Sequence, residues 1–276
     1  MSKRNTQEAK RDARERLRAE REKQARKEKM RRQLTVGGIV AGVLALAVLV
    51  GFTIANLGSG GDSTDWEAIA ADLEEQGENA EYAIPANASG EDGLTISIGD
   101  EGAADVFSFY EEPRCPACAD FERTTGDTVA DGIEGGDFRG EWTFGTFFDE
   151  QMNGGTGSKN AISALGAALD VSPEAFLGYL HALYSEEFHT SDNRADDFGD
   201  DDKLIEVGRS VEALSDDAAF SQFEESVRES TFAAWSIRMG EKFADDPEIT
   251  GTPTVLLNGE RVETPRSPEE LLSLLG

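Results

Sequence analysis

The 276-residue chain is strongly acidic, with 26 Lys and Arg against 55 Asp and Glu and a formal net charge of −29. Charge of that sign repels phosphate backbones and anionic surfaces, so the composition excludes the usual nucleic-acid-binding classes and predicts no nucleic-acid partner. The length allows one membrane segment together with one or two modest domains.

The charge is divided unevenly along the chain. Residues 1–33 carry 14 basic and 6 acidic side chains, residues 34–57 carry none, and residues 58–276 carry 12 basic against 49 acidic. The uncharged run is mostly apolar and long enough to span a bilayer as a helix. A cleaved signal peptide would have a shorter apolar core and a much briefer basic leader. We therefore expect Leu34–Leu57 to be an uncleaved transmembrane helix in the lipid bilayer.

The basic residues beside this apolar run set its orientation. Arg31 and Arg32 adjoin the run, so the positive-inside rule predicts a cytoplasmic N-terminus in a single-pass protein of the cell membrane. The acidic bulk then lies outside, on the oxidising side where disulfides persist. The expected domains are a basic cytoplasmic segment (1–33), a transmembrane helix (34–57), an extracytoplasmic linker (58–90) and an outer domain (91–276).

The outer part of the chain begins with mixed α/β patterning. A short helix is predicted over 64–75, after which the apolar residues of Leu94–Ile98 alternate as in a half-buried strand. A strand over 104–110, a helix to about residue 131 and a strand over 141–149 follow. This order predicts a βαβ unit with a parallel pair of strands.

Apolar side chains then recur at helical spacing over a block of about 151–246. We interpret the five apolar stripes as core rather than as a cofactor site. They are Ile162, Leu165 and Leu169; Phe176, Leu180, Leu183 and Tyr184; Leu204, Val207, Val211 and Leu214; Phe220, Phe223 and Val227; and Phe232, Trp235, Met239 and Phe243. The aspartate-rich segment 191–202 lacks the ligand spacing of an EF-hand, which favours a solvated loop over a calcium site.

Strand patterning returns near the end of the chain. Thr254–Leu257 is apolar, and Asn258-Gly259 predicts a two-residue hairpin turn before a short strand over 260–262. Ser267-Pro268-Glu269-Glu270 has the form of a capping box with proline at the first helical position. A final helix rich in leucine is therefore expected.

The two cysteines of the chain are Cys115 and Cys118, in one Cys-Pro-Ala-Cys motif where strand patterning gives way to helix. That spacing on a strand-to-helix turn is typical of a redox-active dithiol. A thiolate at a helix N-terminus faces unpaired backbone N–H groups and the positive end of the helix dipole, which lower its pKa. Pro116 suits the first turn because its missing N–H costs nothing there.

Two other uses of the cysteine pair are open but less well supported. Zinc normally takes four ligands, and only His181 and His189 could join the two thiolates, at a spacing unlike that of zinc fingers. A structural disulfide closing so short a loop would restrict the unfolded chain little. No metal and no other cofactor is therefore predicted.

A second motif, Gly251-Thr252-Pro253-Thr254, stands immediately before the late strand. A proline at the start of a strand is ordinary by itself. Combined with Cys-Pro-Ala-Cys and the helical block, it resembles the thioredoxin fold in its DsbA-like branch, where a helical domain is inserted mid-fold. The resemblance covers about residues 91–276, and the membrane-anchored DsbA-like proteins of bacteria are the nearest match.

The resemblance implies roles for the residues of both motifs. Cys115 would be the exposed attacking thiolate and Cys118 the buried resolving thiol, with Pro116 and Ala117 tuning the redox couple. The bond before the proline of the second motif would be cis, with that proline packed against the dithiol. The residue before it, Thr252, would offer its backbone to an extended substrate segment.

The resemblance also implies a function. The chain is expected to be an extracytoplasmic thiol–disulfide oxidoreductase that introduces disulfides into exported proteins with free cysteines and is reoxidised by a membrane partner. A reductase or isomerase of the same fold, and a non-catalytic binding or chaperone module with a structural disulfide, are the alternatives.

Three charged residues before the dithiol leave the redox direction open. Glu111 and Glu112 would raise a nearby thiol pKa, whereas Arg114 would lower it. The Pro-Ala pair also lacks the histidine of the strongest oxidants of this family. A higher thiol pKa would make the couple a weaker oxidant.

Overall fold

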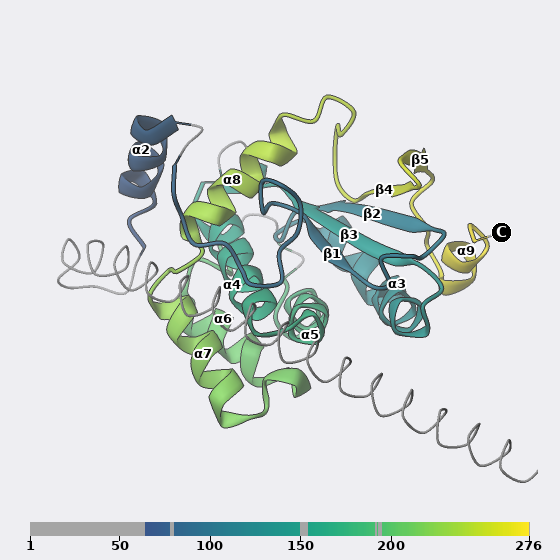
Figure 1. Ribbon diagram of the computed structural model, residues 1–276. Helices are drawn as coiled ribbons and strands as arrows, with labels where there is room; N and C mark the ends of the chain where they lie inside the picture. Colours follow the sequence, from purple (N-terminus) through teal and green to yellow (C-terminus); the bar gives the residue numbers. More distant parts are fainter. Residues whose placement is uncertain (1–63, 78–79, 150–153, 191, 193–194, 276) are drawn as a thin grey trace, which may run out of the picture. The chain divides into compact units, whose positions relative to one another are not determined.

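The computed structural model describes residues 64–77, 80–149, 154–190, 192 and 195–275 (Figure 1). The predicted transmembrane helix Leu34–Leu57 and the basic segment before it lie outside the described residues, so both stay predictions. Within the described residues, no helix combines the length and the apolar character that crossing a membrane requires.

One five-stranded sheet forms the β layer of the fold (Figure 1). Its strands are β1 (Ile96–Ile98), β2 (Val106–Glu111), β3 (Arg139–Phe144), β4 (Thr254–Leu257) and β5 (Glu260–Val262). The order in space is β1-β3-β2-β4-β5, with β2 and β3 parallel and the other three pairs antiparallel. The predicted βαβ unit with a parallel pair of strands is therefore confirmed.

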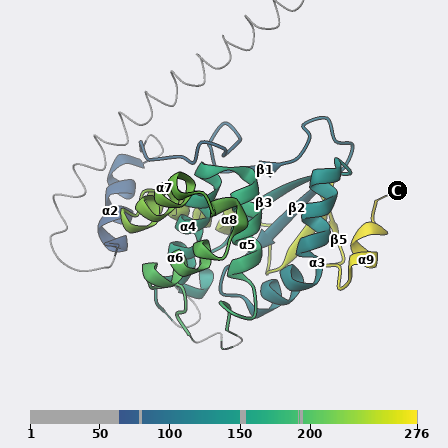
Figure 2. The ribbon, with the colours of Figure 1, turned by 90° about the horizontal axis from the view of Figure 1, so that it is seen from below.

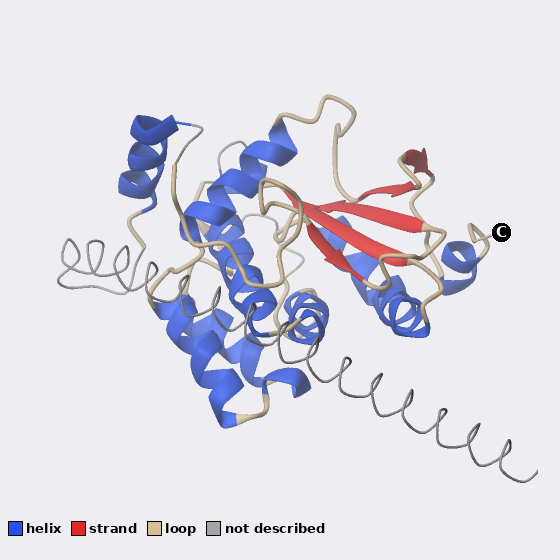
Figure 3. Ribbon diagram, viewed as in Figure 1, coloured by secondary structure: helices blue, strands red, loops and turns tan. Residues whose placement is uncertain are grey.

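Helices precede the strands of the sheet, connect them and follow them along the chain. The helix between β2 and β3 is α3 (Pro116–Gly135), and the chain closes with α9 (Pro268–Leu272). Before the sheet comes α2 (Trp66–Gln76); between β3 and β4 come α4 (Gly157–Val171), α5 (Pro173–Leu183), α6 (Asp201–Arg209), α7 (Asp217–Arg228) and α8 (Ala233–Ala244). Figures 2 and 3 show α4–α8, the helical insertion, grouped to one side of the strands, with α9 on the other side.

The sheet and the helical insertion share one core of buried aromatic side chains. Trp142 of β3 lies between Phe109 of β2 and Phe176 of α5, with ring centroids 5.2 Å and 5.5 Å away. Trp235 of α8 is also fully buried, and its indole N–H donates to the carbonyl of Gly93 ahead of β1 at 2.9 Å. Offset and edge-to-face aromatic pairs add to the free energy gained by burial alone. The insertion is therefore packed onto the sheet, not tethered to it.

The predicted third strand is too long. It was expected over 141–149, whereas β3 ends at Phe144 and the chain makes a helical turn at residues 147–149. The N–H of Gly145 still donates to the Glu111 carbonyl at 2.8 Å. Beyond Gly145 the two-residue alternation of buried side chains seen in β3 is lost. Phe147 packs instead against the ring of Phe243, with centroids 6.0 Å apart.

The third predicted helix of the insertion is also wrong in its length. The stripe from Leu204 to Leu214 predicted one helix, but α6 ends at Arg209 and a separate 3₁₀ turn, η3, covers Glu212–Leu214. Ser210 ends α6 because its hydroxyl and its N–H both bind the Val207 carbonyl, at 2.7 Å and 3.0 Å. Ser and Thr hydroxyls compete with the helical backbone in this way.

We predict that two glycines of α3 respond oppositely to alanine. A Cβ at Gly132 would overlap the ring of Phe138, which packs edge-on against Phe107 in the core. Gly132→Ala should lower the free energy of unfolding by about 1–3 kcal/mol, as overpacking does. A Cβ at Gly135 meets only the Asp137 carboxylate at 3.5 Å.

Gly135→Ala is the matched control on the same helix. It should leave stability unchanged or raise it by up to about 1 kcal/mol through helix propensity. Urea unfolding of the two variants measures the difference. Equal destabilisation by both would contradict the packing of Phe138 onto Gly132.

Candidate active site

The turn between β2 and α3 carries the first cysteine. Glu111 ends β2, and Cys115 is the N-cap of α3 with Pro116 at the first helical position. The N–H of Cys115 donates to the Glu112 carbonyl at 2.9 Å, and the N–H of Arg114 donates to the Glu112 carboxylate at 2.7 Å. The sulfur therefore sits where the free N–H groups of α3 converge.

The second motif is brought to this turn by strand pairing. β4 runs antiparallel to β2 with Thr254 opposite Tyr110, so the residues before β4 lie beside the residues after β2. The Thr252–Pro253 peptide bond is cis, as the resemblance implies. The Thr252 carbonyl oxygen lies 3.8 Å from the Cys115 sulfur and accepts from it.

The two thiols differ in their access to solvent. Cys115 is 7% exposed and Cys118 is fully buried, and both are reduced. Cys115 is thus less open than the exposed thiolate that the resemblance implies, because the Thr252 carbonyl lies against its sulfur. It is nevertheless the one sulfur of the pair that retains exposed surface, so an attacking partner reaches the dithiol through Cys115.

The thiols also differ in acidity. A hydrogen bond from the Cys118 thiol lowers the pKa of Cys115 to about 6, helped by the side chain of Thr252 and by the backbone N–H groups of Cys118 and Ala117, while burial opposes the shift. Burial raises the pKa of Cys118 well above its ordinary value, and the hydrogen bond to Cys115 and the charge of Glu111 act in the same direction. At neutral pH the pair is therefore a thiolate at Cys115 and a thiol at Cys118.

Buried carboxyl groups surround the sulfur pair. Burial raises the pKa of Glu111 well above its ordinary range, with a further contribution from Glu122, whose own pKa burial raises to about 7. Burial likewise raises the pKa of Glu112 to about 8. Glu112 is therefore mostly protonated at neutral pH and is not the fixed charge beside Cys115 that the sequence suggested. Glu111 acts instead on the pKa of Cys118.

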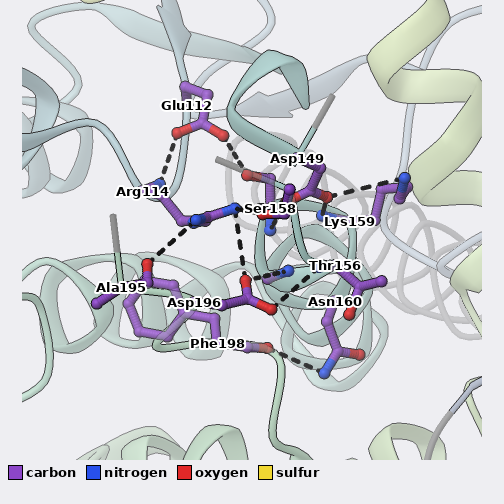
Figure 4. Close-up of polar contacts among 12 residues, drawn as sticks. Glu112, Arg114, Asp149, Thr156, Ser158, Lys159, Asn160, Ala195, Asp196 and Phe198 are labelled. Atoms are coloured by element: carbon purple, nitrogen blue, oxygen red, sulfur yellow. Dashed lines mark hydrogen bonds and ion pairs between the residues drawn. The ribbon is translucent and has the colours of Figure 1, made fainter. Parts of the chain in front are cut away.

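Arg114 is also placed differently from its sequence interpretation. Its guanidinium binds the Asp149 carboxylate at 2.9 Å and the Ala195 carbonyl at 3.1 Å, toward the helical insertion (Figure 4). The Asp149 carboxylate therefore balances the positive charge of this guanidinium. The lowering of the Cys115 pKa comes mainly from Cys118, Thr252 and backbone N–H groups.

Sequence reasoning missed several residues of the site. Glu122 follows Cys118 by four residues on α3 and shares its face, so helical spacing could have found it. Tyr184 of the insertion, whose hydroxyl donates to the Glu112 carbonyl at 3.1 Å, carries no such signal. The six predicted residues all lie at this site: Cys115, Pro116, Ala117, Cys118, Thr252 and Pro253.

The two histidines of the zinc alternative are not placed as ligands. His189 is buried between the rings of Tyr184 and Phe198, and His181 lies 3.8 Å from the Asp127 carboxylate. Among the residues that the structure describes, no group of three or more His, Cys, Asp or Glu side chains is arranged to hold a metal ion.

Comparison with known proteins places this geometry in context. The family model described as Thioredoxin matches residues 91–276. Similar solved structures include reduced DsbG, a disulfide bond oxidoreductase, and oxidised DsbA, both from Mycobacterium tuberculosis. Each has a TM-score of 0.53 and 25% identity over 66% of this chain, covering 85% and 90% of the respective neighbours. Among curated proteins, none matches the sequence.

A third similar structure shares the fold at lower identity. MdbA, a thiol-disulfide oxidoreductase from Actinomyces oris, has a TM-score of 0.57 and 19% identity, covering 74% of this chain and 94% of that one. The expected thioredoxin-like α/β fold with its added helices is confirmed by these matches together with the sheet order.

The low pKa of Cys115 predicts a pH-dependent reactivity. The rate of alkylation by iodoacetamide should rise about tenfold per pH unit below the pKa and level off above about 6. The lowered pKa also makes the stability of the reduced chain depend on pH. The thiolate contributes fully to folding stability above pH 9.0, the ordinary pKa of a cysteine thiol, and this contribution is lost as the pH falls through about 6.

The Cys115→Ser variant is the control for that measurement. It should lose the fast reaction entirely, because Cys118 is buried and its pKa is raised. A midpoint near 9.0, the ordinary value for a thiol, would contradict the proposed thiolate.

Proposed function

Because the chain belongs to the thioredoxin family and is a protein-disulfide oxidoreductase of the DsbA type, we propose that it introduces disulfides into exported proteins outside the cytoplasm. The observation that carries this proposal is the asymmetry of the dithiol. Cys115 has a pKa lowered to about 6 and keeps some exposed surface, whereas Cys118 is buried with a raised pKa. A stabilised thiolate stabilises the reduced form, which makes the couple an oxidant.

The proposed reaction moves two electrons from two substrate thiols to the dithiol. A substrate thiolate attacks the Cys115 sulfur of the oxidised chain, the bond to Cys118 breaks, and Cys118 leaves and takes up a proton. A second substrate thiolate then attacks the substrate sulfur of the mixed disulfide. The substrate disulfide forms, and Cys115 is released as a thiolate. Its low pKa makes it a good leaving group.

The substrate segment is proposed to bind beside Thr252. Its carbonyl is already directed at the Cys115 sulfur, 3.8 Å away, and Pro253 follows in the cis conformation. An extended segment bonded to the Thr252 backbone would carry its own cysteine to Cys115. Main-chain bonds of this kind accept many sequences, which suits an enzyme with varied clients.

The proposed location follows from the charge pattern of the chain. A basic segment over 1–33, an apolar anchor over 34–57 and an acidic domain beyond them support a single-pass protein whose catalytic domain faces outward. Tethering to the bilayer would raise the effective concentration of the dithiol near exported proteins. A membrane redox partner is proposed to reoxidise the dithiol after each turnover.

We expect substitution of the two cysteines to have different effects. In the full-length chain, Cys115→Ala should abolish dithiol exchange, because no other sulfur of the pair reaches a substrate. Cys118→Ala should accumulate mixed disulfides with clients, because its Cys115 thiolate can still attack a client disulfide but no Cys118 thiol remains to release the client. Non-reducing electrophoresis of both variants tests this. If Cys115→Ala retained full activity, the disulfide would be structural and the chain a binding or chaperone module.

The direction of electron flow gives a separate prediction. Titration of the full-length chain against glutathione should give a reduction potential between about −120 and about −180 mV, the range from DsbA to protein disulfide isomerase. A value near about −270 mV, as in thioredoxin, would favour a reductase. Thiol alkylation in intact cells should find the pair mostly oxidised and the chain in the membrane fraction, and a steadily reduced pair would contradict the oxidase.

A further inference from the structure

The residue immediately before the dithiol is a buried arginine with no part in the reaction described above. The Arg114 side chain is 3% exposed and lies among groups from the helical insertion and the segments that flank it (Figure 4). It binds two carboxylates and two backbone carbonyls: Asp149 at 2.9 Å, Asp196 at 3.4 Å, Gly154 at 3.1 Å and Ala195 at 3.1 Å. Cys115 is therefore attached through its neighbour to another part of the fold.

The same two carboxylates bind the start of α4. Thr156 is the N-cap of α4, and its side chain makes no capping bond. The first four N–H groups of the helix are bonded instead to Asp196, through Thr156 (3.1 Å) and Gly157 (2.8 Å), and to Asp149, through Ser158 (2.9 Å) and Lys159 (3.0 Å). The positive helix end and Arg114 thus share one pair of anions.

Glu112 makes a second connection between the turn and α4. Its carboxyl group accepts from the Arg114 N–H at 2.7 Å and from the Ser158 hydroxyl. Its carbonyl accepts from the Cys115 N–H at 2.9 Å and the Tyr184 hydroxyl at 3.1 Å. Glu112, Arg114 and Cys115 are therefore each bonded to the insertion, directly or through one intervening residue.

Stability alone is a weak reason for such a network. Burial raises the pKa of Asp149 even though Arg114 and two N–H groups lower it, which shows how much desolvation opposes the charge. A buried ion pair often stabilises a fold no better than apolar side chains of similar volume. What it does supply is a fixed geometry, since Arg donors bind only in defined directions.

Geometry is what the Cys115 thiolate needs. Its stabilisation comes from short-range bonds to Cys118, to the Thr252 side chain and to the backbone N–H groups at the start of α3, all of which weaken with a small displacement of the sulfur. Functional groups require support that holds them within a fraction of an ångström. On the side of the insertion, that support is the network around Arg114.

We propose that Arg114 and Asp149 are positioning residues for the dithiol: they bind the turn before Cys115 to the N-terminus of α4, so that the helical insertion determines where the sulfur lies relative to α3 and the Thr252 carbonyl. This inference rests on the dithiol chemistry proposed above. Neither residue contacts the substrate; each acts through the placement of Cys115.

Positioning and plain electrostatics make opposite predictions for one of two substitutions. Removing the positive charge with Arg114→Met raises the pKa of Cys115 under either explanation. Removing the negative charge with Asp149→Asn lowers that pKa if the network acts through charge, because Arg114 is then less neutralised. If the network acts through placement, Asp149→Asn raises the pKa, because the guanidinium loses its fixed partner.

The experiment measures the Cys115 pKa, by thiolate absorbance against pH, and the equilibrium with glutathione in the full-length chain and both variants. We expect both variants to raise the pKa by about one unit. We also expect both to shift the glutathione equilibrium about tenfold toward the oxidised form, which corresponds to a potential about 30 mV more negative. Shifts of opposite sign, or a lower Tm with an unchanged pKa and equilibrium, would overturn the proposal.

Two further variants serve as controls. Arg238→Met removes an arginine that also binds two carbonyls and a carboxylate, those of Leu73, Gly77 and Glu241, and should lower Tm without altering the pKa of Cys115. Arg114→Lys keeps the positive charge but lacks the planar set of guanidinium donors, so the pKa of Cys115 should return only part of the way to its wild-type value. If Arg114→Met does not fold, Arg114→Lys and Asp149→Asn decide the question. A wild-type chain without exchange activity would refute the proposed function, whereas an active wild type with unaltered variants would refute only this inference.

Discussion

The antiparallel pairing of β4 with β2 is the constraint on which the site depends. β2 ends at Glu111 where β4 begins at Thr254, so the two loops that carry Cys115 and Thr252 must meet at one edge of the sheet. These residues are 137 positions apart in sequence, yet the sulfur and the carbonyl oxygen lie 3.8 Å apart. The helical insertion leaves the sheet after β3 and returns to it at β4, and β2, whose end leads to Cys115, lies between these two strands.

Desolvation governs the chemistry of the two sulfurs. Burial raises the pKa values of Glu111 and Glu112, because little solvent is present to stabilise their charged forms. Burial opposes the Cys115 thiolate too, but the direct hydrogen bonds from the Cys118 thiol and from backbone N–H groups outweigh it. The pKa values of neighbouring buried groups therefore shift in opposite directions, according to whether direct hydrogen bonds outweigh the loss of solvent.

The sequence was most informative where the signal is local. The strand-to-helix turn at Cys115, the alternation in β1, the proline at the first position of α3 and the parallel pair of strands all follow from neighbouring residues. Glu122 could have been added to the site by counting one helical turn from Cys118. The network around Arg114 could not, because Asp149 lies 35 residues from it in sequence and belongs to a turn that the sequence predicted as strand.

The errors in the fold have a related cause. Apolar residues beyond Phe144 extended the predicted strand to residue 149, and Val211 kept the helical spacing that joined α6 to η3 in the prediction, although the backbone changes its hydrogen bonding at both places. The termini of elements depend on single hydroxyl or N–H bonds, such as those of Ser210, which periodicity does not register.

The N-terminus of α4 has a consequence for protein engineering. Its first N–H groups are satisfied by Asp149 and Asp196, from outside the helix, and those same side chains are the partners of Arg114. For this reason the helical insertion cannot be exchanged as an independent unit. A foreign block transplanted between β3 and β4 would have to bring its own anions to the same place, or leave the Arg114 guanidinium without an anionic partner one residue before Cys115.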